Sequence, residues 1–243
     1  MNEKELLEKR IKELNRRAFE RGYNTFSDFL NMNEQSIASG LYLPYKSFGG
    51  YENAERCVLG FGDNLKDDDF PICCIKIEPV QQKFADKLSH RDFLGSLMNL
   101  GINRNLLGDI VINDNCGYLF CLDGIGDYIC NNISKVKHTS VKCIKVNSKT
   151  DLIIKEPEEE EIIVSSLRAD AVISSIYKLS RNDAASLFSQ ESVFINSKAI
   201  NKASAALKEG DVVSVRHKGR FIFLGELRKT KKDRIVVEVK IFR

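Results

Sequence analysis

Six short segments between residues 73 and 146 alternate in type, and their order restricts the fold more than any other feature of the sequence. The strand-like runs are 73–78 (CCIKIE), 108–114 (GDIVIND), 117–123 (GYLFCLD) and 140–146 (SVKCIKV), and the helix-like runs are 90–101 (HRDFLGSLMNLG) and 124–136 (GIGDYICNNISKV). The order β-α-β-β-α-β is that of a split βαβ arrangement. The sequence therefore predicts an α+β domain over residues 71–155, with Leu94, Leu97 and Met98 on the inward face of its first helix.

Two aromatic residues stand on the third strand of this predicted sheet. Ferredoxin-like folds share this order of elements, and the RNA recognition motif (RRM) uses it too, so we expect an RRM-like middle domain. Such a motif stacks bases on aromatic side chains of its central strands. Tyr118 and Phe120 point to one face, whereas the first strand offers no aromatic residue. Two interpretations stay open: base stacking, or packing of this face beneath the N-terminal helices.

Residues 1–70 are predicted to form a helical cap with a small strand region. Apolar residues at Leu7, Ile11, Leu14 and Ala18 form one stripe of a helix over 3–22, which Gly22 can end. A second short helix is expected within 25–40, ending at Gly40. A loop and then a strand follow, with Gly49 and Gly50 at the turn.

Charge divides the chain unevenly at an acidic run, EPEEEE, at 156–161. From Ile162 onward there are 16 lysines and arginines against 8 acidic residues, a net charge of +8, whereas the preceding residues have 21 against 26, a net charge of −5. We expect 156–164 to be an acidic linker, either a hinge or an exposed strand between domains. The asymmetry indicates a polyanion-binding module over 165–243 with a basic tail.

The C-terminal part predicts two short helices followed by strands. Asp170 and Ser180 are candidate caps of the helices, and the apolar residues behind them recur at helical spacing. Cationic residues recur at the turns and helix ends, where phosphate-binding side chains are displayed on a firm core. The candidate RNA-binding residues are Arg168, Lys178, Arg181, Lys198, Lys202, Arg216, Lys218 and Arg220. Arg181 is the strongest, because a cap and a helix N-terminus beside it both favour a phosphate.

Residues 165–221 resemble the S-four RNA-binding domain. The matching positions are Leu167-Arg168, Asp170, Ser180-Arg181, Val193 to Asn196, Gly210-Asp211 and Val215-Arg216. Three residues depart from the usual pattern: Ala169 replaces a common leucine, Ser197 stands where glycine or a bulky residue is usual, and His217 stands where glycine is usual. His217 could alter the backbone of the basic turn or add a pH-sensitive contact.

Nearly the whole chain resembles the YlmH family, through GGYENAER (49–56) and LSHRDFLGSLMNLGINRNLLGDIVI (88–112). The resemblance implies a bacterial RNA-binding protein that associates with large ribosomal subunits carrying obstructed peptidyl-tRNA, in ribosome-associated quality control. Its expected partners are ribosomal RNA and tRNA. Whether Glu55, Arg56, His90 and Arg91 form an internal polar network or a contact surface stays open.

Three motifs in the sequence are also found in enzymes. The triplet His90-Arg91-Asp92 occurs in kinases, but Leu97 stands where a kinase needs a metal-binding Asn. LRAD (167–170) and the Gly-x-Gly in LGFGDN (59–64) leave one alternative, an RNA-modifying enzyme of pseudouridine synthase or methyltransferase type acting on rRNA or tRNA. We expect no catalytic residues and no cofactor, because the three histidines stand near no plausible nucleophile and base pair. We expect no metal, because the seven cysteines contain no C-x-x-C pair.

The N-terminus, MNEKELLEKRIKELNRR, is charged throughout, and no apolar run approaches the roughly 20 residues of a membrane span. These features predict a cytoplasmic protein without membrane contact. Cysteines in a reducing compartment are expected to be small buried apolar residues. We expect the protein to be monomeric when free.

Overall fold

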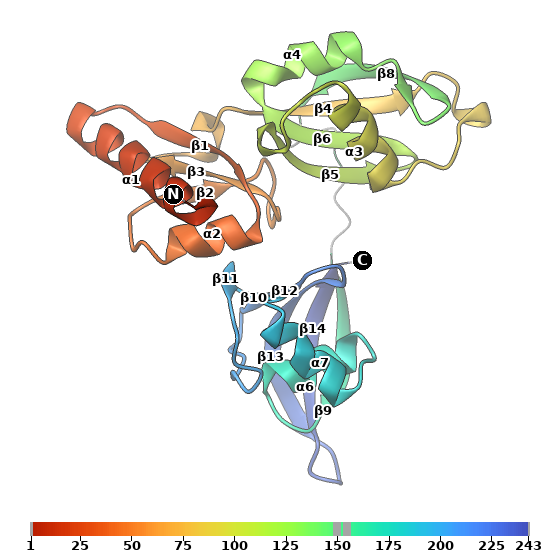
Figure 1. The fold of residues 1–243 in the computed structure, drawn as a ribbon. Helices are drawn as coiled ribbons and strands as arrows, with labels where there is room; N and C mark the ends of the chain where they lie inside the picture. Colours follow the sequence, from red (N-terminus) through yellow and green to blue (C-terminus); the bar gives the residue numbers. More distant parts are fainter. Residues whose placement is uncertain (1, 148–151, 153–156, 243) are drawn as a thin grey trace. The chain divides into compact units, whose positions relative to one another are not determined.

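The computed structural model describes residues 2–147, 152 and 157–242, and the chain divides into two compact units, 1–154 and 155–243 (Figure 1). The first unit contains both the N-terminal region and the domain predicted over 71–155. None of the described helices combines the length and apolar character needed to cross a membrane.

The N-terminal region places two helices on a small antiparallel sheet. Its elements are α1 (Glu3–Arg21), β1 (Thr25–Leu30), α2 (Met32–Ser39), β2 (Lys46–Phe48) and β3 (Cys57–Phe61), with the strand order β1-β3-β2. Asn2 and Glu5 form a capping box at the start of α1, and Gly22 ends the helix in the left-handed region at φ 68°, as predicted.

The helix expected within 25–40 is only half correct. Residues Thr25–Leu30 form β1, which pairs with β3, and the helix α2 occupies Met32–Ser39. The helix begins only at Met32 because Asn31 and Glu34 form a capping box there. The residues before it form a strand, which places Phe29 fully buried against the middle sheet.

The middle sheet has the strand order β5-β6-β4-β8-β7 and is antiparallel throughout. The elements are β4 (Ile72–Pro79), α3 (His90–Asn99), β5 (Leu107–Asn113), β6 (Cys116–Leu122), α4 (Asp123–Asn132), β7 (Lys135–Val136) and β8 (Thr139–Val146), with 3-10 turns at Asp67–Asp69, Gln82–Phe84 and Arg104–Leu106. The order β4-α3-β5-β6-α4-β8 is the predicted one. The helix expected over 124–136 ends four residues early, because Lys135 and Val136 pair with Ser140 and Thr139 in a hairpin.

Helices α3 and α4 pack on one face of this sheet (Figure 1). Phe93 and Leu97 of α3 are fully buried, and Leu94 packs at the edge of the same core. Met98, expected on the inward face, is only half-buried, and the large buried ring of Phe93 was not predicted. A β-carbon on Gly117 of β6 would lie 2.7 Å from that ring, so glycine is required at this position.

The second unit is a six-stranded antiparallel sheet with two helices. The elements are β9 (Glu158–Val164), α6 (Ala169–Ile176), α7 (Arg181–Ser189), β10 (Val193–Ile195), β11 (Lys198–Ala199), β12 (Val212–Val215), β13 (Gly219–Lys229) and β14 (Ile235–Phe242), in the order β11-β10-β12-β13-β14-β9. Both helices contribute to one core with the sheet, including Val172, Ile173, Ala184 and Phe188.

Of the two forms expected for the acidic linker over 156–164, the structure has the exposed strand at residues 158–164 and not a hinge, and residue 156 lies outside the described residues. Glu158–Val164 form β9, which pairs with β14 along its whole length. Two of its glutamates form ion pairs with cations of the same sheet: Glu159 with its cross-strand partner Lys240 of β14 at 2.9 Å, and Glu161 with Arg228 of β13, one strand further away. Pairs of opposite charge therefore stabilise the acidic run as a strand.

Candidate nucleic-acid interface

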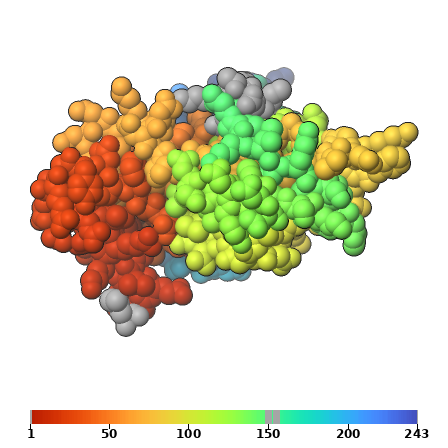
Figure 2. Space-filling view, turned by 90° about the horizontal axis from the view of Figure 1, so that it is seen from above, coloured from red at the N-terminus to blue at the C-terminus, as the bar shows by residue number. Residues whose placement is uncertain are grey.

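The aromatic face of the middle sheet is covered by the N-terminal region. Tyr118 is 7% and Phe120 1% exposed, and both pack with Phe29 and Phe70. The ring of Tyr51 stacks on that of Phe120 at a centroid distance of 4.9 Å. Of the two interpretations, packing is therefore correct, although strands and a loop cover the face where helices were expected. Figure 2 shows the N-terminal part, red to orange, lying directly against the yellow and green segment.

Asp109 of β5 joins the two parts of the first unit. Its carboxylate accepts hydrogen bonds from the Tyr51 hydroxyl (2.9 Å), the Glu55 amide (2.6 Å) and the Arg56 amide (3.1 Å). Three donors from one loop thus converge on one carboxylate of the middle sheet. Asp109 was not among the predicted residues, and its only signal in the sequence is a carboxylate next to Gly108 at the start of an apolar strand.

Two half-buried arginines surround this carboxylate. Arg56 donates through Nε to the Leu107 carbonyl oxygen (2.9 Å) and through Nη2 to that of Phe29 (3.1 Å), and Arg104 donates through Nη1 to the Leu107 carbonyl oxygen (2.6 Å). Burial lowers the pKa of both guanidinium groups, and the neighbouring Arg56 helps to lower that of Arg104 to about 10.

His90 lies at the solvent-facing edge of this network, and partial burial followed by the charge of Arg104 lowers its pKa. Arg56 and the Glu55 amide therefore belong to an internal polar network that His90 borders, whereas Arg91 is exposed. Asp92 accepts hydrogen bonds from the Ser89 amide (2.8 Å) and hydroxyl (2.6 Å) in a capping box. The triplet His90-Arg91-Asp92 is thus the start of a structural helix, as predicted.

Two of the predicted RNA-binding residues lie at the start of α6. The Ala169 and Asp170 amides donate to the carbonyl oxygens of Ala205 and Ala203, which places the exposed Lys202 segment beside Arg168. Arg168 is held by Asp170 through Nε at 3.0 Å and Nη2 at 2.6 Å. The Asp170 carboxylate, which would be the catalytic group if LRAD were a pseudouridine synthase motif, is thus bound by Arg168.

Arg181 is exposed on the first turn of α7. Ser180 caps this helix by accepting from the Asp183 amide at 3.1 Å, as predicted. The Arg181 Nη2 donates to the Ser165 hydroxyl at 3.0 Å, so its guanidinium group lies where the loop before α6 meets the start of α7. A positioned guanidinium beside a helix N-terminus suits a phosphate.

A second group of cations lies around the turn between β12 and β13. The Tyr177 hydroxyl at the end of α6 is 3.6 Å from where a β-carbon on Gly219 would stand, so Lys178 and this turn are neighbours. Arg216 and Lys218 are exposed in the turn. The guanidinium carbon of Arg220 lies 4.2 Å from the ring centroid of Phe242, an arrangement that fixes the side chain by a cation–π contact.

Lys198 lies in the β10–β11 hairpin, on the edge strand β11 of the six-stranded sheet. Asn196 and Ser197 at its turn have φ values of 51° and 61°, the left-handed pair of a two-residue hairpin turn. His217 has φ 62°. Ser197 and His217, the two positions at which glycine occurs in the S-four pattern, therefore both have a positive φ.

The remaining candidates for chemistry have structural roles. A β-carbon on Gly60 would lie 2.9 Å from Phe70, so the first glycine of LGFGDN serves packing. The cysteines are free thiols, with Cys73 and Cys121 Sγ atoms 3.5 Å apart and those of Cys130 and Cys143 3.2 Å apart. Within the described ranges, no three His, Cys, Asp or Glu side chains gather as metal ligands do.

Cationic side chains carried on turns and helix ends of an α+β unit are typical of proteins that bind the phosphates of nucleic acids. Comparison with known proteins narrows this class. Residues 66–150 match the family model described as "Putative RNA-binding domain in YlmH". The chain is 30% identical over 219 residues to the "Ribosome-associated protein quality control protein P2" of Bacillus subtilis, a match that covers 86% of this chain and 83% of that protein.

A solved structure is also similar. The "Cell division protein ylmH from Streptococcus pneumoniae" matches with a TM-score of 0.51 and 20% identity, covering 63% of this chain and 96% of that chain. This likeness concerns the fold alone. The sequence relationship and the matching family model establish that the chain belongs to the YlmH family.

Proposed function

We propose that this chain is a non-catalytic RNA-binding protein that associates with the ribosome and acts in quality control of stalled translation. The observation that carries the proposal is the relationship to a ribosome-associated quality control protein over most of both chains. The RNA-binding description of the family model for residues 66–150 supports it.

In this proposal the second unit is an S-four module that binds ribosomal RNA and tRNA on a large subunit carrying obstructed peptidyl-tRNA. The exposed Arg181 and Lys202 at the helix starts, and Lys178 and Lys218 at the far turn, would contact phosphates. Arg220 and Arg168 are already engaged by Phe242 and Asp170, which orients them without neutralising the net charge of the unit. The protein would position RNA by shape and charge and alter no bond.

Co-sedimentation with purified large ribosomal subunits at several salt concentrations tests the proposal. We expect wild type to migrate with the subunit and to dissociate as salt rises, because phosphate contacts release counterions. Arg181→Glu should abolish migration, whereas Arg21→Glu, the same change of charge at the end of α1, should leave it unchanged. Wild type that stays at the top of every gradient would refute the ribosomal role.

A further inference from the structure

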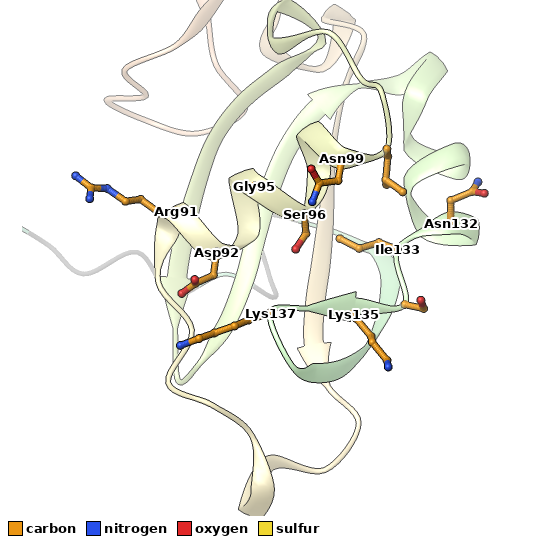
Figure 3. A pocket seen from close by; sticks show the side chains of 11 residues that line it. Arg91, Asp92, Gly95, Ser96, Asn99, Asn132, Ile133, Lys135 and Lys137 are labelled. Atoms are coloured by element: carbon orange, nitrogen blue, oxygen red, sulfur yellow. The ribbon is translucent and has the colours of Figure 1, made fainter.

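A polar groove runs along the first unit on the side of the middle sheet that carries the helices. It has a volume of about 500 Å³ and lies between α3, the end of α4 and the β7–β8 hairpin (Figure 3). This side lies opposite the aromatic face that the N-terminal region covers. The groove is thus accessible to a ligand, whereas the sheet face that RRM domains use for RNA is covered.

The groove carries an excess of positive charge. Arg91, Lys135 and Lys137 line it and are exposed, and within the described part of the chain no ion pair engages them. Asp92 is the acidic residue among the lining side chains; its carboxylate accepts hydrogen bonds from Ser89 at the start of α3 and attracts the nearby charge of Lys137, so the three cations exceed the acidic charge by two. Figure 3 shows Lys137 extending from the hairpin toward Asp92, with Arg91 on the neighbouring position of the helix.

The helix α3 lines the groove with an exposed glycine that no packing explains. Gly95 lies inside α3, where glycine costs about 1 kcal/mol of helix stability relative to alanine. A β-carbon built there would meet no atom within 4 Å, unlike one at Gly117, which would collide with Phe93. The helix backbone is therefore left bare on the α3 side of a basic groove, as close approach by a ligand requires.

The rest of the lining can make hydrogen bonds of both kinds. Asn99 offers an amide donor and acceptor and Ser96 a hydroxyl, while Asn132, whose Nδ2 donates to the Tyr128 carbonyl oxygen at 2.7 Å, offers its amide oxygen. A ribose hydroxyl next to a phosphate both donates and accepts hydrogen bonds and can use all of these groups, whereas an ionised peptide carboxylate only accepts and can use the donors alone. All of these residues lie within 66–150, the segment that matches the RNA-binding family model.

We propose that this groove binds the sugar-phosphate backbone of RNA, with Lys135, Lys137 and Arg91 on phosphates and the bare backbone at Gly95 allowing close approach. The inference rests on the proposed function and adds a second RNA surface to it, separate from the C-terminal unit. An RRM-like domain that binds RNA by its helical side needs no aromatic platform, so the burial of Tyr118 and Phe120 no longer conflicts with RNA binding.

The test measures the affinity of the full chain for a fluorescein-labelled RNA of mixed sequence, single-stranded or folded as a hairpin, by anisotropy against salt. The variants are Lys135→Glu with Lys137→Glu, and Gly95→Gln, each in the wild-type and in the Arg181→Glu background. The paired backgrounds separate the groove from the C-terminal unit, because independent sites change the binding free energy additively. Lys9→Glu with Lys12→Glu on α1 provides the same change of charge away from the groove.

We expect the double lysine variant to lose about tenfold or more in affinity and to reduce the salt slope by about 2, in both backgrounds. Gly95→Gln should raise the melting temperature, because glutamine favours a helix, and should nevertheless weaken RNA binding by filling the groove. A gain in stability with a loss of binding cannot arise from misfolding.

Groove variants that bind RNA like wild type, while Arg181→Glu loses binding, would overturn the groove proposal and leave the proposed function intact. The groove proposal also fails if the α1 control loses as much affinity as the groove variant. Wild type that binds neither RNA probe nor ribosomal subunits would refute both proposals.

Discussion

Replacing Asp109 by alanine is the sharpest test of how the first unit is held together. The carboxylate accepts three hydrogen bonds from the segment 51–56 and offsets the charge of two half-buried arginines. A hydrogen bond to a charged group contributes about 1.5–3 kcal/mol, and loss of the carboxylate also leaves the two half-buried arginines without a neighbouring negative charge. Because these terms overlap, we expect a loss of about 3–5 kcal/mol for Asp109→Ala.

The assay is urea unfolding followed by circular dichroism, with hydrogen exchange to locate the effect, since the chain contains no tryptophan. Amides of β3 and β5 should lose protection, and those of β13 and β14 in the second unit should not. Tyr51→Phe, which keeps the stacked ring and removes one hydrogen bond, should cost about 1 kcal/mol.

Glu161→Ala is the comparison for an ordinary carboxylate. Its ion pair with Arg228 is exposed on both sides, and such pairs contribute about 0–1 kcal/mol. If Asp109→Ala destabilises the protein no more than Glu161→Ala does, or if exchange accelerates equally in both units, the network does not join the N-terminal region to the middle sheet.

The remaining predictions concern single side chains. The lowered pKa of His90 means that the folded state resists protonation, so stability should fall as pH drops below the ordinary value of 6.5; melting temperatures against pH should flatten in His90→Gln, and an unchanged slope would contradict this. Ser197→Gly should raise the stability of the second unit by about 0.5–1 kcal/mol, because φ is 61°, and a loss in thermal melts would refute the turn geometry. The buried Tyr177 hydroxyl has no hydrogen-bond partner among the described residues, and burial raises its pKa to about 12, so Tyr177→Phe should be neutral or stabilising; destabilisation beyond about 1 kcal/mol would reveal an unrecognised partner.

Local patterns in the sequence predicted the elements whose partners are near in the chain. The strands and helices between β4 and β8 follow from apolar periodicity, and the start of α7 follows from the Ser180 cap. Thr25–Leu30 was misassigned because a short apolar run does not distinguish helix from strand, and pairing with the distant β3 decides between them.

The candidate site was predictable to the extent that it depends on charge. Exposed cations at turns and helix ends can be recognised from spacing, and Arg181 lies beside a capped helix as expected. The role of Asp109 could not be recognised, because its donors lie more than fifty residues away in the sequence. The groove was equally hidden, since it forms only when the β7–β8 hairpin lies against α3.

The pairing of β9 with β14 has a consequence for where the second unit begins. A fragment starting at residue 165, where the S-four resemblance starts, would remove β9 and uncover the backbone donors and acceptors of Ile235–Phe242. That strand carries Val237 and Val239 in the core, and an uncovered apolar edge pairs readily with a second molecule. The glutamates of β9 thus place negative charge on the edge strand and disfavour pairing with another molecule. An independently folding fragment therefore has to include Glu158.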